Sequence, residues 1–137
     1  MSVFVLGADT NLLVRFVTGD DPTQSPQSLQ LVTKDSNQPI HICIVALVEM
    51  VWVLTKVKRR PIQEVLNVCR DLIMSSNFRV EQDDLVARAI EDAATAGCDL
   101  ADALIALVNQ KAGCEATATF DTAAQRLEHM VPVERRL

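Results

Sequence analysis

Two aspartates three residues apart begin the segment of the chain best suited to carry chemistry. Residues 98–106 read Cys-Asp-Leu-Ala-Asp-Ala-Leu-Ile-Ala. The spacing of Asp99 and Asp102 places both on roughly one face of the first turn of a predicted helix, 99–112. That helix is expected to bury Leu104, Ile105, Leu107 and Val108. An acid beside such residues is partly buried and needs a partner, yet the first cation in the helix is Lys111.

Other acids are candidates to share the site with Asp102. Asp9 and Asp121 each follow a β-prone run and precede a helical one. Both are therefore expected at the carboxyl end of a strand, which is where open α/β sheets build their sites. Thr10 and Asn11 can cap the first helix or hold Asp9 by hydrogen bonds. The alternative is that Asp9 serves only as a helix N-cap.

Glu49 is the only acid between residues 40 and 57. Its neighbours three and four positions away are all apolar, which argues against a solvated helix face. These neighbours are Val45, Ala46, Trp52 and Val53. We therefore interpret Glu49 as a site residue rather than a surface residue.

The hydrophobic pattern predicts strands and helices that alternate along the chain. Strands are expected at 3–6, 40–44, 78–80, 116–120 and 130–133. Helices are expected at 12–17, 25–34, 45–57, 62–75, 83–96, 99–112 and 122–128. Such alternation predicts a single helix-rich α/β domain, 1–137, with three α/β/α layers and a central, mostly parallel sheet. Glu49 and Asp102 are expected in the first turns of their helices.

Four carboxylates at one sheet edge would call for a cation. Two of them about 4 Å apart repel by roughly 4 kcal/mol at an effective dielectric near 20. Oxygen-only ligands favour Mg²⁺ or Mn²⁺, and the absence of nearby Cys and His disfavours zinc. Such an ion activates water and stabilises charge on a phosphate, so phosphodiester hydrolysis is the indicated reaction.

Composition sets limits on these hypotheses. The net charge of −5 counts mildly against a nucleic-acid partner, and 4% aromatics without Tyr disfavour a base-stacking platform. The four cysteines contain no Cys-x-x-Cys pair and are expected as small buried residues in a reducing cytoplasm. No apolar run reaches the roughly 18 residues of a membrane span, and no secretory signal is evident.

Four segments, in order along the chain, resemble the motifs of PIN-domain ribonucleases. Residues 6–15 contain Asp9-Thr10-Asn11, residues 45–54 contain Glu49, residues 99–106 contain Asp102, and residues 119–121 end in Asp121. The chain's length is similar to that of VapC-type toxins of toxin–antitoxin pairs. The resemblance implies a cytoplasmic Mg²⁺- or Mn²⁺-dependent endoribonuclease that forms a homodimer and is neutralised by a VapB-like antitoxin.

Each candidate site residue has an expected role in metal binding, catalysis or RNA contact. Asp9, Glu49, Asp102 and Asp121 would hold the metal and catalyse hydrolysis, with a water attacking the RNA phosphate. Thr10, Asn11 and Thr119 would orient the acids, and Asp99 is either a helix N-cap or an extra ligand. The candidate RNA contacts are Arg15, Lys56, Lys58, Arg59 and Arg60, although a basic run of this kind is often only a solvated loop.

Two other classes of function stay open. A metal-dependent phosphatase of the haloacid-dehalogenase type also has an acid after its first strand, but it needs a second acid where this chain has Asn11. A non-enzymatic binding module would use the acids only as helix caps and would act through its partner. A metal titration separates these classes, because only a clustered acid site is stabilised as metal fills it.

Overall fold

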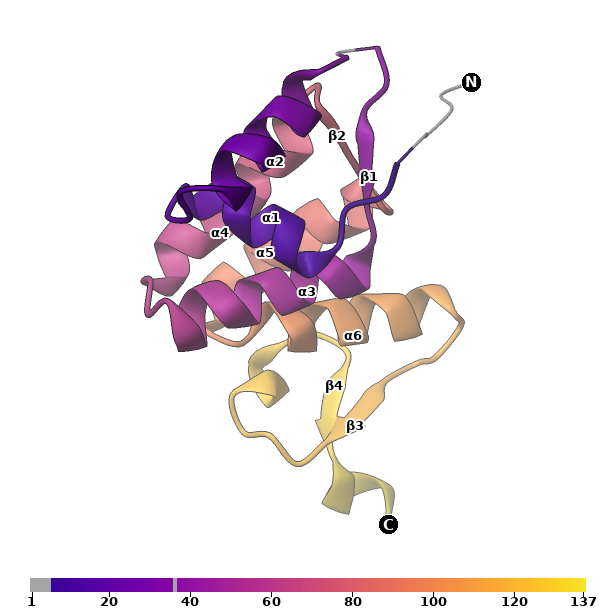
Figure 1. The fold of residues 1–137 in the computed structure, drawn as a ribbon. Coiled ribbons are helices and arrows are strands. Elements are labelled where there is room, and N and C mark those ends of the chain that lie inside the picture. Colours follow the sequence, from indigo (N-terminus) through magenta and orange to yellow (C-terminus); the bar gives the residue numbers. More distant parts are fainter. Residues whose placement is uncertain (1–5, 36) are drawn as a thin grey trace. The chain divides into compact units, whose positions relative to one another are not determined.

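The computed structural model describes residues 6–35 and 37–137 (Figure 1). The chain divides into two compact units, Met1–Asp83 and Asp84–Leu137, and each is described by itself. Most of the strand predicted at 3–6 lies outside the described residues. Gly7, directly after it, forms a parallel bridge with His41.

The first unit is built mainly from helices. Its elements are α1 (Thr10–Thr18), α2 (Gln24–Thr33), β1 (Ile40–Ile42), α3 (Ile44–Trp52), the π-helical turn η1 (Val53–Val57), α4 (Ile62–Met74) and β2 (Phe78–Val80). Strands β1 and β2 run parallel, with Ile40 opposite Phe78 and Ile42 opposite Val80. The helix predicted at 45–57 is therefore a shorter α-helix continued by a π-helical turn.

Apolar side chains from several elements form the core of the first unit. Leu13, Ile42 and Leu47 are fully buried, and they come from α1, β1 and α3. The ring of Phe78 in β2 packs edge-on against that of Phe16, with centroids 5.3 Å apart. This core fixes α1 and α3, which carry Asp9 at one end and Glu49 along one side.

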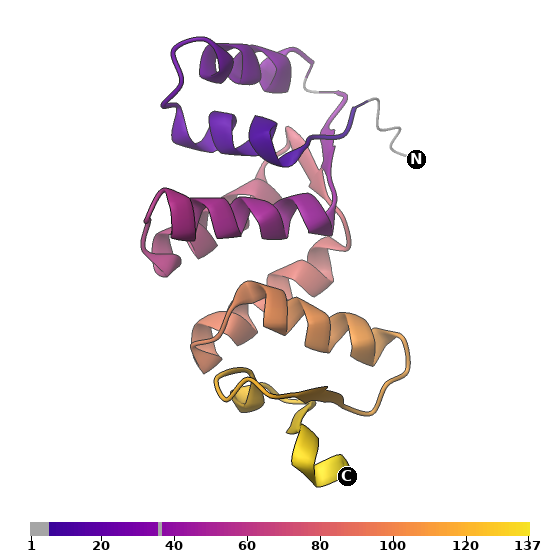
Figure 2. The same cartoon turned by 60° about the horizontal axis from the view of Figure 1, so that its bottom comes forward.

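Helices α1 and α2 form a hairpin, visible side by side in Figures 1 and 2. Gly19 ends α1 with φ +62°, a left-handed conformation that glycine adopts without strain. The buried hydroxyl of Ser25 donates to the carbonyl of Arg15 at 2.8 Å, and that of Ser28 donates to the carbonyl of Gln24 at 2.9 Å. The Ser25 bond joins α2 to α1, whereas the Ser28 bond lies within α2, so one hydrogen bond from a buried side chain ties the hairpin in addition to apolar packing.

The second unit pairs two helices with a short parallel ladder. Its elements are α5 (Asp83–Ala96), whose first residue precedes the boundary, α6 (Leu100–Lys111), β3 (Thr117–Thr119), the 3₁₀ turn η2 (Ala124–Arg126), β4 (Met130–Pro132) and the 3₁₀ turn η3 (Val133–Arg136). Thr117 lies opposite Met130 in the β3–β4 ladder. The positive φ of Gly97 lets α5 end and α6 begin within three residues.

The helix-rich chain with parallel strands confirms the α/β fold class. Some details were predicted wrongly. The helix expected at 122–128 is only the short 3₁₀ turn η2. In α6 the buried stripe is Leu100, Ala103, Leu104 and Leu107, whereas Ile105 and Val108 are 48% and 39% exposed. The 3.6-residue period explains this difference, because position 105 falls on the opposite side of the helix from the stripe and position 108 falls at its edge.

The cysteines and the apolar helices were also the subject of expectations from the sequence. Only Cys69 is buried, Cys43 and Cys98 are half-buried, and Cys114 is exposed, so burial of all four cysteines was wrong. Across residues 6–35 and 37–137, no helix has the length and apolar character needed to cross a membrane.

Candidate functional site

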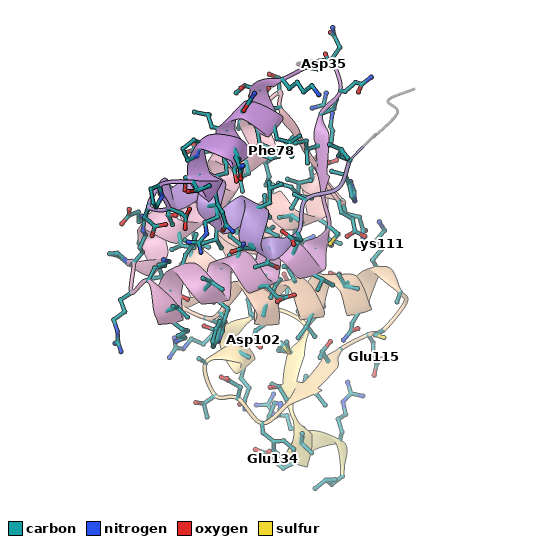
Figure 3. All side chains as sticks on the ribbon, viewed as in Figure 1. Asp35, Phe78, Asp102, Lys111, Glu115 and Glu134 are labelled. Atoms are coloured by element: carbon teal, nitrogen blue, oxygen red, sulfur yellow. The ribbon has the colours of Figure 1, made fainter. Side chains whose placement is uncertain are left out.

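Asp102 lies in the first turn of α6, as predicted, and is marked in Figure 3. Partial burial raises the pKa of this carboxyl above its ordinary value, and the negative charges of Asp121 and Asp99 raise it further. All three influences act in the same direction. The second unit therefore places Asp121 and Asp99 close enough to Asp102 to disfavour its charge.

The backbone around Asp121 is held by local hydrogen bonds. Its carboxylate accepts a bond from the N–H of Ala124 at 3.0 Å, and its own N–H donates to the hydroxyl of Thr119 at 3.0 Å. Thr119 thus positions the Asp121 backbone, which is one way of supporting the acid. Asp121 itself is exposed, two residues after β3 ends.

Asp99 occupies the N-cap position of α6, but its side chain makes no capping hydrogen bond. Its carboxylate is therefore not committed to the helix end. Beside it, burial raises the pKa of the Cys98 thiol, with further increases from Asp102, Asp99 and Asp121. Cys98 was not predicted as part of this cluster. Its position directly before Asp99 was the only signal in the sequence.

Asp9 is the N-cap of α1, and its Oδ1 accepts a hydrogen bond from the N–H of Leu12 at 2.9 Å. The capping alternative is thus found in the structure. It does not exclude a second role, because the bond engages one carboxylate oxygen and the side chain is exposed. Thr10 is the first residue of α1. Asn11 points its amide Nδ2 toward Gln24 Oε1 at 3.4 Å, so it is not seen to hold Asp9.

Glu49 is exposed on α3, so the inference from its apolar neighbours that it does not lie on a solvated face was wrong. Val45 and Trp52, one turn away on either side, are themselves 67% and 58% exposed. Glu49 also lies in the second turn of α3 rather than the first, because the helix begins at Ile44. The carboxylate is accessible to an ion but is not held by the apolar core.

Some of the candidate RNA contacts are engaged with acids of the first unit. Lys58 Nζ lies 2.9 Å from Asp20 Oδ2, and Arg15 lies 3.6 Å from the same carboxylate. The hydrogen bond from Lys58, with that from Thr18, lowers the pKa of Asp20 to about 2. Arg60 pairs with Glu64 at 3.7 Å. Lys56 is exposed in the π-helical turn η1, and Arg59 is exposed just after η1 ends.

A shallow groove of about 270 Å³ lies next to Asp9 in the first unit. Asn11, Arg15 and Gln24 line it, and Arg15 Nε donates to Gln24 Oε1 at 2.9 Å. Gln24 was not predicted as a functional residue, because a glutamine near the start of a helix has no distinctive sequence pattern. It lies beside predicted site residues only through the hairpin formed by α1 and α2.

The comparison with protein families gives a match to the PIN domain over residues 8–130, which is most of the chain. The chain belongs to the PIN-domain family. PIN domains are generally nucleases and typically use divalent metals. The comparison with curated proteins gave no match.

The family match bears on how this PIN domain could hold a metal. Among the residues that the structure describes, no group of three or more His, Cys, Asp or Glu side chains is arranged to bind an ion. Asp9 and Glu49 belong to the first unit, while Asp102 and Asp121 belong to the second. Convergence of all four therefore stays a prediction, and the structure brings together only the members within the second unit.

Proposed function

We propose that this PIN domain is a Mg²⁺- or Mn²⁺-dependent endoribonuclease and the toxin of a type II toxin–antitoxin pair. The observation that carries the proposal is the position of Asp102 in the second unit, partly buried and close enough to Asp121 and Asp99 for their charges to raise its pKa. Neighbouring like charges disfavour the charged form of a carboxylate. A cation bound among such acids neutralises them and removes this cost. The family match supports hydrolysis of nucleic acid as the chemistry that this arrangement serves.

The donor set fits a hard divalent cation. Asp102 and Asp121 would supply carboxylate oxygens from the second unit, and Asp9 and Glu49 would supply exposed carboxylates from the first. These ligands suit Mg²⁺ or Mn²⁺, whereas His and Cys would be expected for zinc. When bound, the ion supplies charge neutralisation and Lewis-acid chemistry at the scissile phosphate.

The chain's own residues would position the reaction and move its proton. A carboxylate of the group would accept the proton of the attacking water, and Asp102 is the candidate because burial and the nearby Asp121 and Asp99 raise its pKa and make it a better proton acceptor. The Thr119 hydroxyl fixes the backbone at Asp121, and the first turn of α1 fixes Asp9. The exposed cations Lys56 and Arg59 would guide the RNA backbone, which offsets the net charge of −5.

The toxin assignment includes the partners expected of it. The order of the four motifs and the chain length resemble VapC-type toxins, so we expect a VapB-like antitoxin, a homodimer and action in the cytoplasm. The exposed Val45 and Trp52 on α3 leave apolar surface that a partner could cover.

The direct test is cleavage of RNA by the purified chain in the presence and absence of Mn²⁺. Asp9→Asn and Asp102→Asn should each lower the cleavage rate by at least about a hundredfold, because each removes a charged ligand. They should also abolish growth arrest on expression, and sequencing of RNA ends should show the wild-type cut sites missing.

Asp71→Asn is the matched control, since Asp71 is an exposed acid on α4 with the same change of charge. It should cleave like the wild type. Retained cleavage by folded Asp102→Asn protein would overturn the proposal. The alternative is a binding module in which Asp9 only caps α1. This alternative would be favoured if the wild-type chain cuts no RNA and its melting temperature does not change with Mn²⁺.

A further inference from the structure

The groove beside Asp9 has the lining of a site for one planar, polar ligand. Its walls include the polar side chains of Asn11, Arg15 and Gln24, together with the apolar side chains of Leu12 and Leu31. The volume of about 270 Å³ is just under the roughly 300–1,000 Å³ of pockets that hold drug-sized ligands. A nucleobase has apolar faces and polar edges, so it matches such walls in size and chemistry.

Gln24 is held in this groove at both its backbone and its side chain. The carboxylate of Asp21 accepts the Gln24 N–H at 2.6 Å, and it also accepts the N–H of Thr23. These two bonds lower the pKa of Asp21. Arg15 Nε donates to the Gln24 side-chain carbonyl at 2.9 Å, and the guanidinium lies 3.6 Å from Asp20 and 4.0 Å from Asp21. Gln24 therefore needs little ordering on binding.

The bond from Arg15 decides which way the Gln24 amide faces. A guanidinium can only donate, so the atom 2.9 Å from Arg15 Nε must be the amide oxygen. Asn11 Nδ2 approaches the same oxygen at 3.4 Å. The oxygen of Gln24 is thus occupied, and its Nε2 remains as a pair of hydrogen-bond donors for a ligand.

We propose that this groove is a base-recognition subsite beside the scissile phosphate and that Gln24 is its specificity-determining residue. The inference rests on the proposed ribonuclease function, because Asp9 at the groove's end would then hold the reacting phosphate. A donor pair selects base edges that carry acceptors. Guanine presents two adjacent acceptors, O6 and N7, whereas adenine presents an acceptor at N7 beside a donor at N6, and uracil presents an acceptor at O4 beside a donor at N3. The subsite therefore prefers guanine over adenine.

The test is an NMR titration of the ¹⁵N-labelled full chain with GMP, AMP and inorganic phosphate. GMP should shift the Gln24 side-chain amide signals, and AMP should bind at least about threefold more weakly. Gln24→Glu should weaken GMP binding about tenfold or more, since loss of a base contact costs about 1–3 kcal/mol. The carboxylate introduced by this substitution can still accept from Arg15, so the side chain should stay in place.

Gln30→Glu is the matched control, because Gln30 lies exposed on the same helix and does not line the groove. It should bind GMP like the wild type. Unchanged GMP affinity in Gln24→Glu, or the same shifts produced by phosphate alone, would overturn the subsite. Mononucleotides contain no internucleotide bond, so a chain that binds GMP through Gln24 but cuts no RNA would contradict the ribonuclease proposal and leave the subsite standing.

Discussion

Asp102 and Glu49 show how differently two predicted acids can be placed. Asp102 was identified from its spacing to Asp99 and from the apolar helix around it, and both features hold in the structure. Glu49 was identified by the same kind of argument, yet it is exposed. In α3 the apolar residues are not confined to one face, so the apolar neighbours Val45 and Trp52 did not indicate burial.

The raised pKa of Asp102 predicts a pH-dependent effect on stability. The folded-state pKa of Asp102 lies above the unfolded value of 3.8. The contribution of the Asp102 carboxyl to the free energy of unfolding is therefore fully present below pH 3.8, and it is lost as pH rises through the folded-state pKa. At pH 7 without metal, Asp102→Asn should therefore melt above the wild type, because the neutral amide avoids the cost of a charged carboxyl at this partly buried position.

Thermal melts from pH 3 to pH 8 in a metal chelator measure this difference. The advantage of Asp102→Asn should vanish below pH 3.8, where the wild-type carboxyl is protonated in both states. A melting temperature of Asp102→Asn equal to or below that of the wild type at pH 7 would show that Asp121 and Asp99 impose no cost on its charge.

Among the elements, the helices were more predictable than the turns between them. Residues 62–75 and 83–96 were expected as helices, and α4 and α5 match them within one residue. The helix expected at 122–128 is only one turn long: Asp121 accepts the N–H of Ala124 at its start, but the backbone becomes extended at Leu127, with ψ 141°. The groove could not be predicted, since it depends on how α1 and α2 pack as a hairpin.

The first turn of α1 allows the capping and chemical roles of Asp9 to be separated. Asn caps a helix about as well as Asp, whereas Ala at the N-cap costs about 1 kcal/mol. Asp9→Asn should therefore keep nearly the wild-type free energy of unfolding, and Asp9→Ala should lose about 1 kcal/mol in urea denaturation. Both should lose RNA cleavage. Normal cleavage by Asp9→Asn would mean that Asp9 is only a cap.

At the scale of the whole molecule, the alternation of strands and helices predicted the α/β class. The PIN-domain match over residues 8–130 extends across both compact units. The predicted site would have the same extent, because two of its four acids belong to each unit. Sequence spacing could predict that these acids lie near strand ends or in helix turns. It could not predict how far each is exposed, because exposure depends on packing between distant segments.

The measurement that tests the central claim most directly is paramagnetic broadening of backbone amide signals by Mn²⁺, added below stoichiometric amounts to the ¹⁵N-labelled chain. If four acids share one cation, the amides of Asp9, Glu49, Asp102 and Asp121 should broaden together, and Asp102→Asn should weaken the broadening at all four. Broadening confined to the surroundings of Asp102 and Asp121, or none at any of these acids, would contradict a shared metal site.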